Sequence, residues 1–161
     1  MPKPSPEDAA SADVVVAQTY FDVSLRGDGI VWLRRTTEVY PDVQAVHRAY
    51  DEFLAEVDDW ALRRRIKSGS LGTTARSPLA WLFDVRAAPS RRNDSEFERV
   101  VGDRRKDLLQ RSPLLAILVR TASGKMQMTR MARSGSANLM VFDDLSAAVA
   151  ALLAGMNQVF G

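Results

Sequence analysis

Apolar residues become regular along this chain only after residue 13. Residues 1–13 are rich in proline, serine, alanine and acidic residues and show no periodicity, so a disordered tail is expected there. The runs at 19–25 and 30–35 are rich in β-branched and aromatic residues, and the sequence Gly27-Asp28-Gly29 lies between them. Two such runs separated by a glycine-containing turn predict a β-hairpin.

Helical and strand-like patterns alternate through the rest of the chain. Helical spacing of apolar residues begins after Pro41-Asp42 and continues through Trp60 and Leu62, whereas 79–86 and 114–119 are nearly continuous apolar runs of strand length. The remaining expected elements are two helices capped by Asn93 and Thr121, a short strand at 139–142, and a last helix capped by Asp143 or Asp144, with Leu145, Val149, Leu152, Leu153 and Met156 facing inward. The order β-β-α-β-α-β-α-β-α predicts an α/β domain over 14–161, with one mixed β-sheet and helices packed on it.

The strand at 79–86 and the helix start after it form the stretch of greatest functional interest. In open α/β sheets, ligands bind beyond the carboxyl ends of the strands. Asn93, with Glu96 three residues later, fits a capping box, so the next helix is expected to begin there. The segment between them, 87–95, is therefore expected to form a loop at the binding edge of the sheet.

Composition limits the classes of function. The chain has 161 residues, a hydrophobic fraction of 46%, a formal net charge of +2 and no cysteine. This length suits one domain with a substantial core, and the lack of cysteine excludes disulfides, thiolate metal sites and cysteine nucleophiles. No apolar run is long enough to span a bilayer and the first residues lack the apolar core of a signal peptide, so a cytoplasmic protein without a membrane partner is expected.

The element order and several segments resemble the STAS-like (SpoIIAA-like) fold of the anti-sigma-factor antagonists and their relatives. The resemblance covers roughly residues 19–156. The segments that carry it are Trp81-Leu82-Phe83-Asp84-Val85-Arg86, Arg92-Asn93-Asp94-Ser95-Glu96-Phe97-Glu98, Val119-Arg120-Thr121 and Val141-Phe142-Asp143-Asp144. The resemblance implies a non-enzymatic bacterial signalling domain, of STAS-like fold, that regulates by binding another protein.

The resemblance also implies where a partner binds. Some family members exchange partners when a serine at the start of the helix after the central strand is phosphorylated. The family motif there is Asp-Ser-Ser-Gly, whereas this chain has Asn93-Asp94-Ser95-Glu96; Ser95 is the nearest positional match, and a solvated first-turn serine is the alternative interpretation. We expect a contact surface at about 87–101. Its candidate interaction or switch residues are Ser90, Arg91, Arg92, Asn93, Asp94, Ser95 and Phe97.

Two isolated polar residues are explained better by structure than by chemistry. His47 is the one histidine and lies between the polar and apolar faces of its helix, so neither a histidine metal pair nor a histidine-dependent triad can be assembled. Asp84 lies inside an apolar strand, either as an acid near a pocket or, as we favour, paired with Arg86 or Arg120. No enzyme activity, metal or cofactor is therefore expected.

Basic residues are concentrated in two stretches of the chain. The stretch at 63–76 is expected to be an arginine-rich flexible loop, and the residues Arg120, Lys125 and Arg130 are candidates for binding an anion. Aromatic residues are not interleaved with either stretch, so a solvated charged face is the default. Binding of a small anionic or lipid ligand is the alternative function, and weak nucleic-acid binding through 63–76 is the third.

Overall fold

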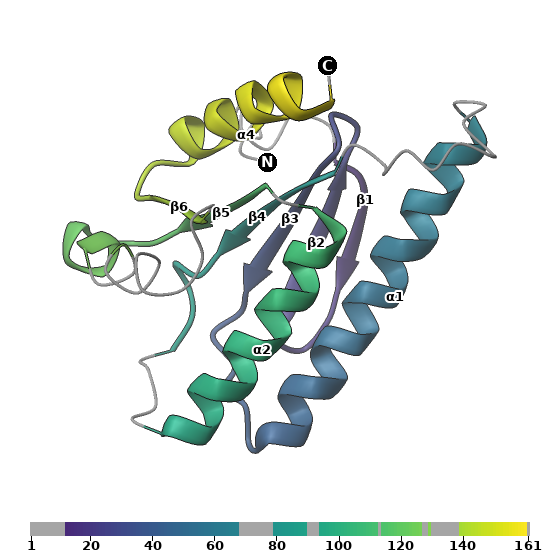
Figure 1. The fold of residues 1–161 in the computed structure, drawn as a ribbon. Coiled ribbons are helices and arrows are strands. Elements are labelled where there is room, and N and C mark those ends of the chain that lie inside the picture. Colours follow the sequence, from purple (N-terminus) through teal and green to yellow (C-terminus); the bar gives the residue numbers. More distant parts are fainter. Residues whose placement is uncertain are drawn as a thin grey trace, which may run out of the picture.

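The structure of the chain, a computed structural model, describes residues 12–67, 79–89, 94–112, 114–126, 129 and 139–160 (Figure 1). Its elements are, in chain order, β1 (Ala12–Ala17), β2 (Phe21–Arg26), β3 (Ile30–Arg35), α1 (Val43–Lys67), β4 (Ala80–Asp84), α2 (Ser95–Arg111), β5 (Leu115–Leu118), β6 (Leu139–Phe142) and α4 (Leu145–Phe160). A short helical segment also covers 122–126.

The six strands form one mixed sheet in the order β1-β2-β3-β4-β5-β6. β1, β2 and β3 pair antiparallel, whereas β3, β4, β5 and β6 are parallel. The prediction of an α/β fold with a single mixed sheet is therefore confirmed. β1 was not predicted, and residues 12 and 13, which were expected in the tail, belong to it. Its three consecutive valines give no alternating pattern, so its register on β2 could not be inferred from the sequence.

Helices cover both faces of the sheet, which gives three layers. α1 and α2 lie side by side on one face, and α4 lies on the other (Figure 1). The β3-α1-β4 and β4-α2-β5 crossovers advance across the sheet in the same direction. Because crossovers between parallel strands are nearly always right-handed, both helices are expected on the same face. The larger core lies under α1 and α2, and the smaller core, which includes Trp32, Leu82 and Leu152, lies under α4.

The predicted hairpin is present, and its turn explains its sequence. Gly29 has a φ of 91°, which a residue with a Cβ adopts only with strain. The Gly29 amide donates to the carbonyl of Arg26 at 3.1 Å, and the Asp28 carboxylate accepts from the amide of Ile30 and from the Arg26 guanidinium. The turn is thus fixed by one glycine and one aspartate.

The helix starts agree with the prediction at α1 and α4 but differ at α2. Asp42 accepts from the amide of Ala45, and Asp144 accepts from that of Ala147. At α2 the N-cap is Asp94, whose Oδ1 accepts from the amides of residues 96 and 97, so the capping box that we expected to start at Asn93 is wrong. A carboxylate at the N-cap also interacts favourably with the helix dipole, which an uncharged amide does not.

Two further expectations about helices are wrong. α1 continues to Lys67, so residues 63–67 belong to a helix and not to the expected loop over 63–76; Arg63 pairs with Asp59 at 2.8 Å, and residues 68–76 lie outside the described residues. Leu153 was expected to face inward, but it is 37% exposed, whereas Leu152 is fully buried. The inward face of α4 instead uses the small residue Ala148, because helical spacing from Leu145 and Leu152 selects it.

Two ion pairs connect α1 to α2 at corresponding positions along the two helices. Arg104 pairs with Asp51 at 2.5 Å, and Arg111 pairs with Asp58 through both carboxylate oxygens at 2.8 and 2.9 Å. Each partner is seven residues, or two helical turns, from its counterpart, as expected for two helices that run parallel. These contacts fix α2, and with it the helix start that follows β4.

Tyr50 gives a test of the core between α1, α2 and the sheet. Its side chain is 1% exposed, and its hydroxyl has no hydrogen-bond partner in the described part of the chain. Burial raises the pKa of the Tyr50 phenol above its ordinary value, and the neighbouring arginines oppose that shift in part. Burying an unpaired hydroxyl is unfavourable, so removing it should not destabilise the protein.

We therefore expect Tyr50→Phe to be neutral or slightly stabilising at pH 7, by up to about 1 kcal/mol. Above a pH of about 10, the unfolded chain releases the phenolic proton while the folded chain keeps it, so the wild type loses stability as the pH rises. The variant should lose less over the same range. Urea unfolding at pH 7 and at pH 10.5 measures both effects, and a loss of more than 1 kcal/mol at pH 7 would show that the hydroxyl is hydrogen-bonded.

Candidate functional site

Parallel pairing brings the carboxyl ends of β3, β4, β5 and β6 to one edge of the sheet. Loops and helix starts that follow these strands lie there, among them residues 85–89, the start of α2 and the segment 119–126 (Figure 1). Crevices beyond such an edge are the usual binding position in open α/β sheets. The side chains at the end of β4 form the hydrogen bonds and ion pair that define this edge.

Asp84 is the last residue of β4 and is only 4% exposed. Its Oδ1 accepts from the Nε of Arg86 at 3.0 Å, and its Oδ2 accepts from an Nη of the same guanidinium at 2.8 Å. Oδ1 also accepts from the backbone amide of Arg86, and Oδ2 from the indole Nε1 of Trp32 at 3.3 Å. The expected pairing of Asp84 with Arg86 is confirmed, and the carboxylate is used to hold a guanidinium and an indole in place.

Arg34 extends this cluster across the sheet. Its guanidinium carbon lies 4.5 Å from the centroid of the Trp32 ring, in a cation–π contact. The cluster of Trp32, Arg34, Asp84 and Arg86, which we call the edge cluster, therefore joins the ends of β3 and β4. Sequence reasoning missed Trp32 and Arg34. Their alternate spacing showed that they share one face of a strand, but only the β3–β4 register places Arg34 opposite Asp84.

The first turn of α2 carries the described part of the expected contact surface. Asp94, Ser95 and Glu96 are exposed, and Phe97 is half-buried against the core of the α1 and α2 side. Glu96 and Glu98 add negative charge to the turn, and the Asp94 carboxylate already occupies two of its free amides. Ser90, Arg91, Arg92 and Asn93 lie outside the described residues.

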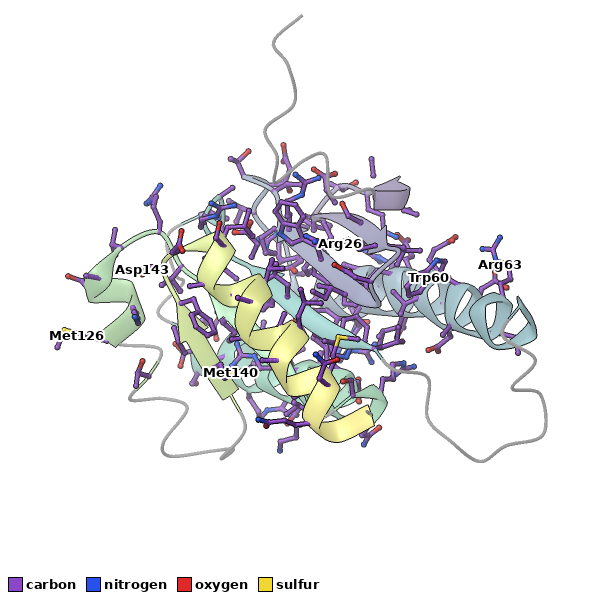
Figure 2. All side chains as sticks on the ribbon, turned by 90° about the horizontal axis from the view of Figure 1, so that it is seen from above. Arg26, Trp60, Arg63, Met126, Met140 and Asp143 are labelled. Carbon is purple, nitrogen blue, oxygen red and sulfur yellow. The ribbon has the colours of Figure 1, made fainter. Side chains whose placement is uncertain are left out.

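The expected anion-binding residues lie on a separate part of the edge. Arg120 is exposed, Lys125 approaches Asp143 at 4.0 Å, and Arg130 lies outside the described residues. Thr121 caps the helical segment 122–126 as expected, because its hydroxyl accepts from the amide of Gly124. The views place this segment away from the start of α2, with Asp143 beside it and Trp60 on the far side (Figures 1 and 2). The structure does not join the two sets of candidates into one site.

Metal binding and membrane spanning find no support in the described ranges. Among those residues, no group of three or more His, Cys, Asp or Glu side chains could hold a metal ion. His47 is half-buried on α1, as its position between the two helix faces predicted. None of the helices, within the part of the chain that the structure covers, is long and apolar enough to cross a membrane.

Comparisons with known proteins identify no relative. The chain matches no protein-family model, no curated protein and no solved structure. Function must therefore be inferred from the residues at the carboxyl edge of the sheet.

Proposed function

We propose that the chain is a non-enzymatic regulatory module of STAS-like type, acting in the bacterial cytoplasm, that binds another protein through about residues 87–101. The order of elements after β2 and the exposed first turn of α2, the helix that follows the central strand, support this proposal. No sequence relative supports it, so it rests on the arrangement of the edge.

The observation that carries the proposal is that the buried carboxylate of Asp84 is fully engaged in hydrogen bonds. Both of its oxygens accept hydrogen bonds from Arg86, and one also accepts from Trp32. A general acid or base needs an oxygen within reach of a substrate, and these oxygens are buried and engaged. A fixed carboxylate that anchors the loop after β4 suits a rigid binding surface better than it suits catalysis.

The first turn of α2 gives the partner a chemical character. Its exposed acidic residues, Asp94, Glu96 and Glu98, present negative charge on a helix end that is fixed to α1. A basic patch complements that surface electrostatically. A phosphate on Ser95 would gain from the helix N-terminus but would meet these same carboxylates, so we propose charge-complementary binding rather than a serine switch.

The test exchanges charge on this turn and compares it with charge elsewhere. The variant is Glu96→Lys with Glu98→Lys, and the matched control is Glu52→Lys with Glu56→Lys, which makes the same change of net charge on the exposed face of α1. Each tagged protein captures partners from a lysate of the source organism, and quantitative mass spectrometry compares them. Thermal unfolding confirms that both variants remain folded.

We expect at least one protein to be enriched on the wild type and on the control, and to fall at least tenfold on the α2 variant. Surface charges act mainly by steering the partner to the right orientation, and salt screens them. The difference in capture between the wild type and the α2 variant should therefore diminish as the salt concentration rises. Equal capture by all three proteins would contradict the proposed surface, as would equal loss from both variants.

A further inference from the structure

Arg34 has an unusual environment for a guanidinium. β3 places it directly between two carboxylates, Asp22 on β2 and Asp84 on β4, which are its cross-strand neighbours. Nevertheless, within the described residues it forms no ion pair or hydrogen bond with either of them, and its buried Nε has no partner. Buried polar groups are usually paired in folded proteins, so the unpaired Nε of Arg34 is a feature that a bound acceptor would satisfy.

Two different contacts hold the guanidiniums of the edge cluster in position. Stacking on Trp32 fixes the plane of Arg34, and the bidentate bond to Asp84 fixes that of Arg86. Arg86 remains 41% exposed and Arg34 is half-buried, so both reach solvent. Because the Trp32 indole also donates to Asp84, one chain of contacts runs from Arg34 through Trp32 and Asp84 to Arg86. A planar guanidinium fixed by stacking, as that of Arg34 is, is suited to bidentate recognition of an oxyanion.

The charges around these two arginines decide which oxyanion fits. Arg34 and Arg86 contribute two positive charges, and Asp22 and Asp84 contribute two negative ones. α4, the helix packed on this face of the sheet, has no charged side chain. The edge cluster together with Asp22 is therefore close to neutral, so it attracts anions weakly at long range and recognises them through short, directional hydrogen bonds. A carboxylate, with one charge, suits it better than a phosphate dianion or a nucleic acid.

We propose that Arg34 and Arg86 form a binding site for a carboxylate group at the ends of β3 and β4. The site is independent of the first turn of α2 and goes beyond the protein-binding function proposed above. The carboxylate comes either from a small organic acid or from an acidic side chain of a protein. Both sources present the same group to Arg34.

The indole N–H of Trp32 reports on this site because its ring contacts Arg34 and its N–H donates to the same Asp84 oxygen that Arg86 bonds. The chain has three tryptophans, and Trp60 and Trp81 lie in the core on the opposite face of the sheet. Their indole signals in a ¹H–¹⁵N NMR spectrum therefore serve as internal controls, and Trp32→Phe assigns the third signal. The full chain is titrated at constant ionic strength with acetate, succinate, inorganic phosphate and a Glu-rich peptide with an amidated carboxyl end.

We expect acetate and succinate to shift the Trp32 signal in a saturable way while the other two signals stay in place. Arg34→Gln and Arg34→Lys should each weaken binding at least tenfold, because the lysine variant retains the charge but loses the planar fork. Arg120→Gln, which removes an exposed arginine from the same edge, should change nothing. Tighter binding of the peptide than of succinate assigns the carboxylate to a protein, and the reverse assigns it to a small acid.

Three results would overturn the site. The first is that acetate and succinate cause no saturable shift at concentrations up to 50-fold above about 1 mM, the dissociation constant expected for a weak site. The second is an unchanged response in Arg34→Gln. The third is phosphate binding tenfold tighter than acetate. None of these results concerns Glu96 or Glu98, so the failure of this site and the failure of the proposed protein-binding surface can be distinguished.

Discussion

Leu152→Ala is expected to lower the free energy of unfolding by about 3 kcal/mol, whereas Leu153→Ala, one residue later on the same helix, should lower it by less than 1 kcal/mol. Leu152 is fully buried in the core under α4, and Leu153 is 37% exposed. The same atoms are deleted from the same helix, so helix propensity cancels between the two variants. What differs is the cavity that the first deletion leaves in the core.

Urea unfolding followed by circular dichroism measures both variants. Equal losses would mean that both leucines face the core, as the sequence pattern predicted, and a larger loss at Leu153 would mean that α4 is rotated about its axis relative to the structure.

Asp84→Ala is expected to cost about 3 kcal/mol of stability. The substitution leaves the Trp32 indole N–H without its acceptor and removes the carboxylate that fixes the Arg86 guanidinium. Loss of one partner from a fully buried ion pair can cost more, but the Arg86 side chain is 41% exposed, so water solvates its charge in part.

Asp59→Ala is the matched control for this variant. It deletes the carboxylate from an aspartate–arginine pair on α1 in which both side chains are 61% exposed, so less than about 0.5 kcal/mol should be lost. Thermal and urea unfolding compare the two. If the losses are equal, Asp84 is solvated and the edge of the sheet is less closely packed than the structure shows.

Local patterns were sufficient for most of the fold. Period-3.6 and continuous apolar runs located α1, α2, α4, β4 and β5, because burial of one helix face or of both strand faces leaves a direct trace in the sequence. β1 left no such trace, since consecutive valines fit an edge strand, a buried strand or a helix equally well. Its position depends on pairing with β2, which is not a local property.

The sequence predicted the contacts between residues that are close in the chain, but it did not predict the contacts that depend on how two strands are aligned. The pairing of Asp84 with Arg86 could be inferred because the residues lie two apart and a buried carboxylate requires a partner. The contribution of Arg34 and Trp32 could not, because it depends on the alignment of β3 with β4. The α2 cap differed by one residue for another reason: Asn93 and Asp94 are both good N-cap residues, and the capping preferences do not separate them.

The central claim is that Asp84 serves to fix Arg86 at the carboxyl edge of the sheet, as part of a binding surface, and is not a carboxylate available for chemistry. A double-mutant cycle over Asp84→Ala, Arg86→Ala and the combined variant measures that coupling directly. We predict a coupling free energy of about 1.5 kcal/mol from urea unfolding in low salt, because the bond is charge-assisted, bidentate and half-buried. A coupling indistinguishable from zero would contradict the account, since Asp84 would then be held at this edge for some purpose other than positioning Arg86.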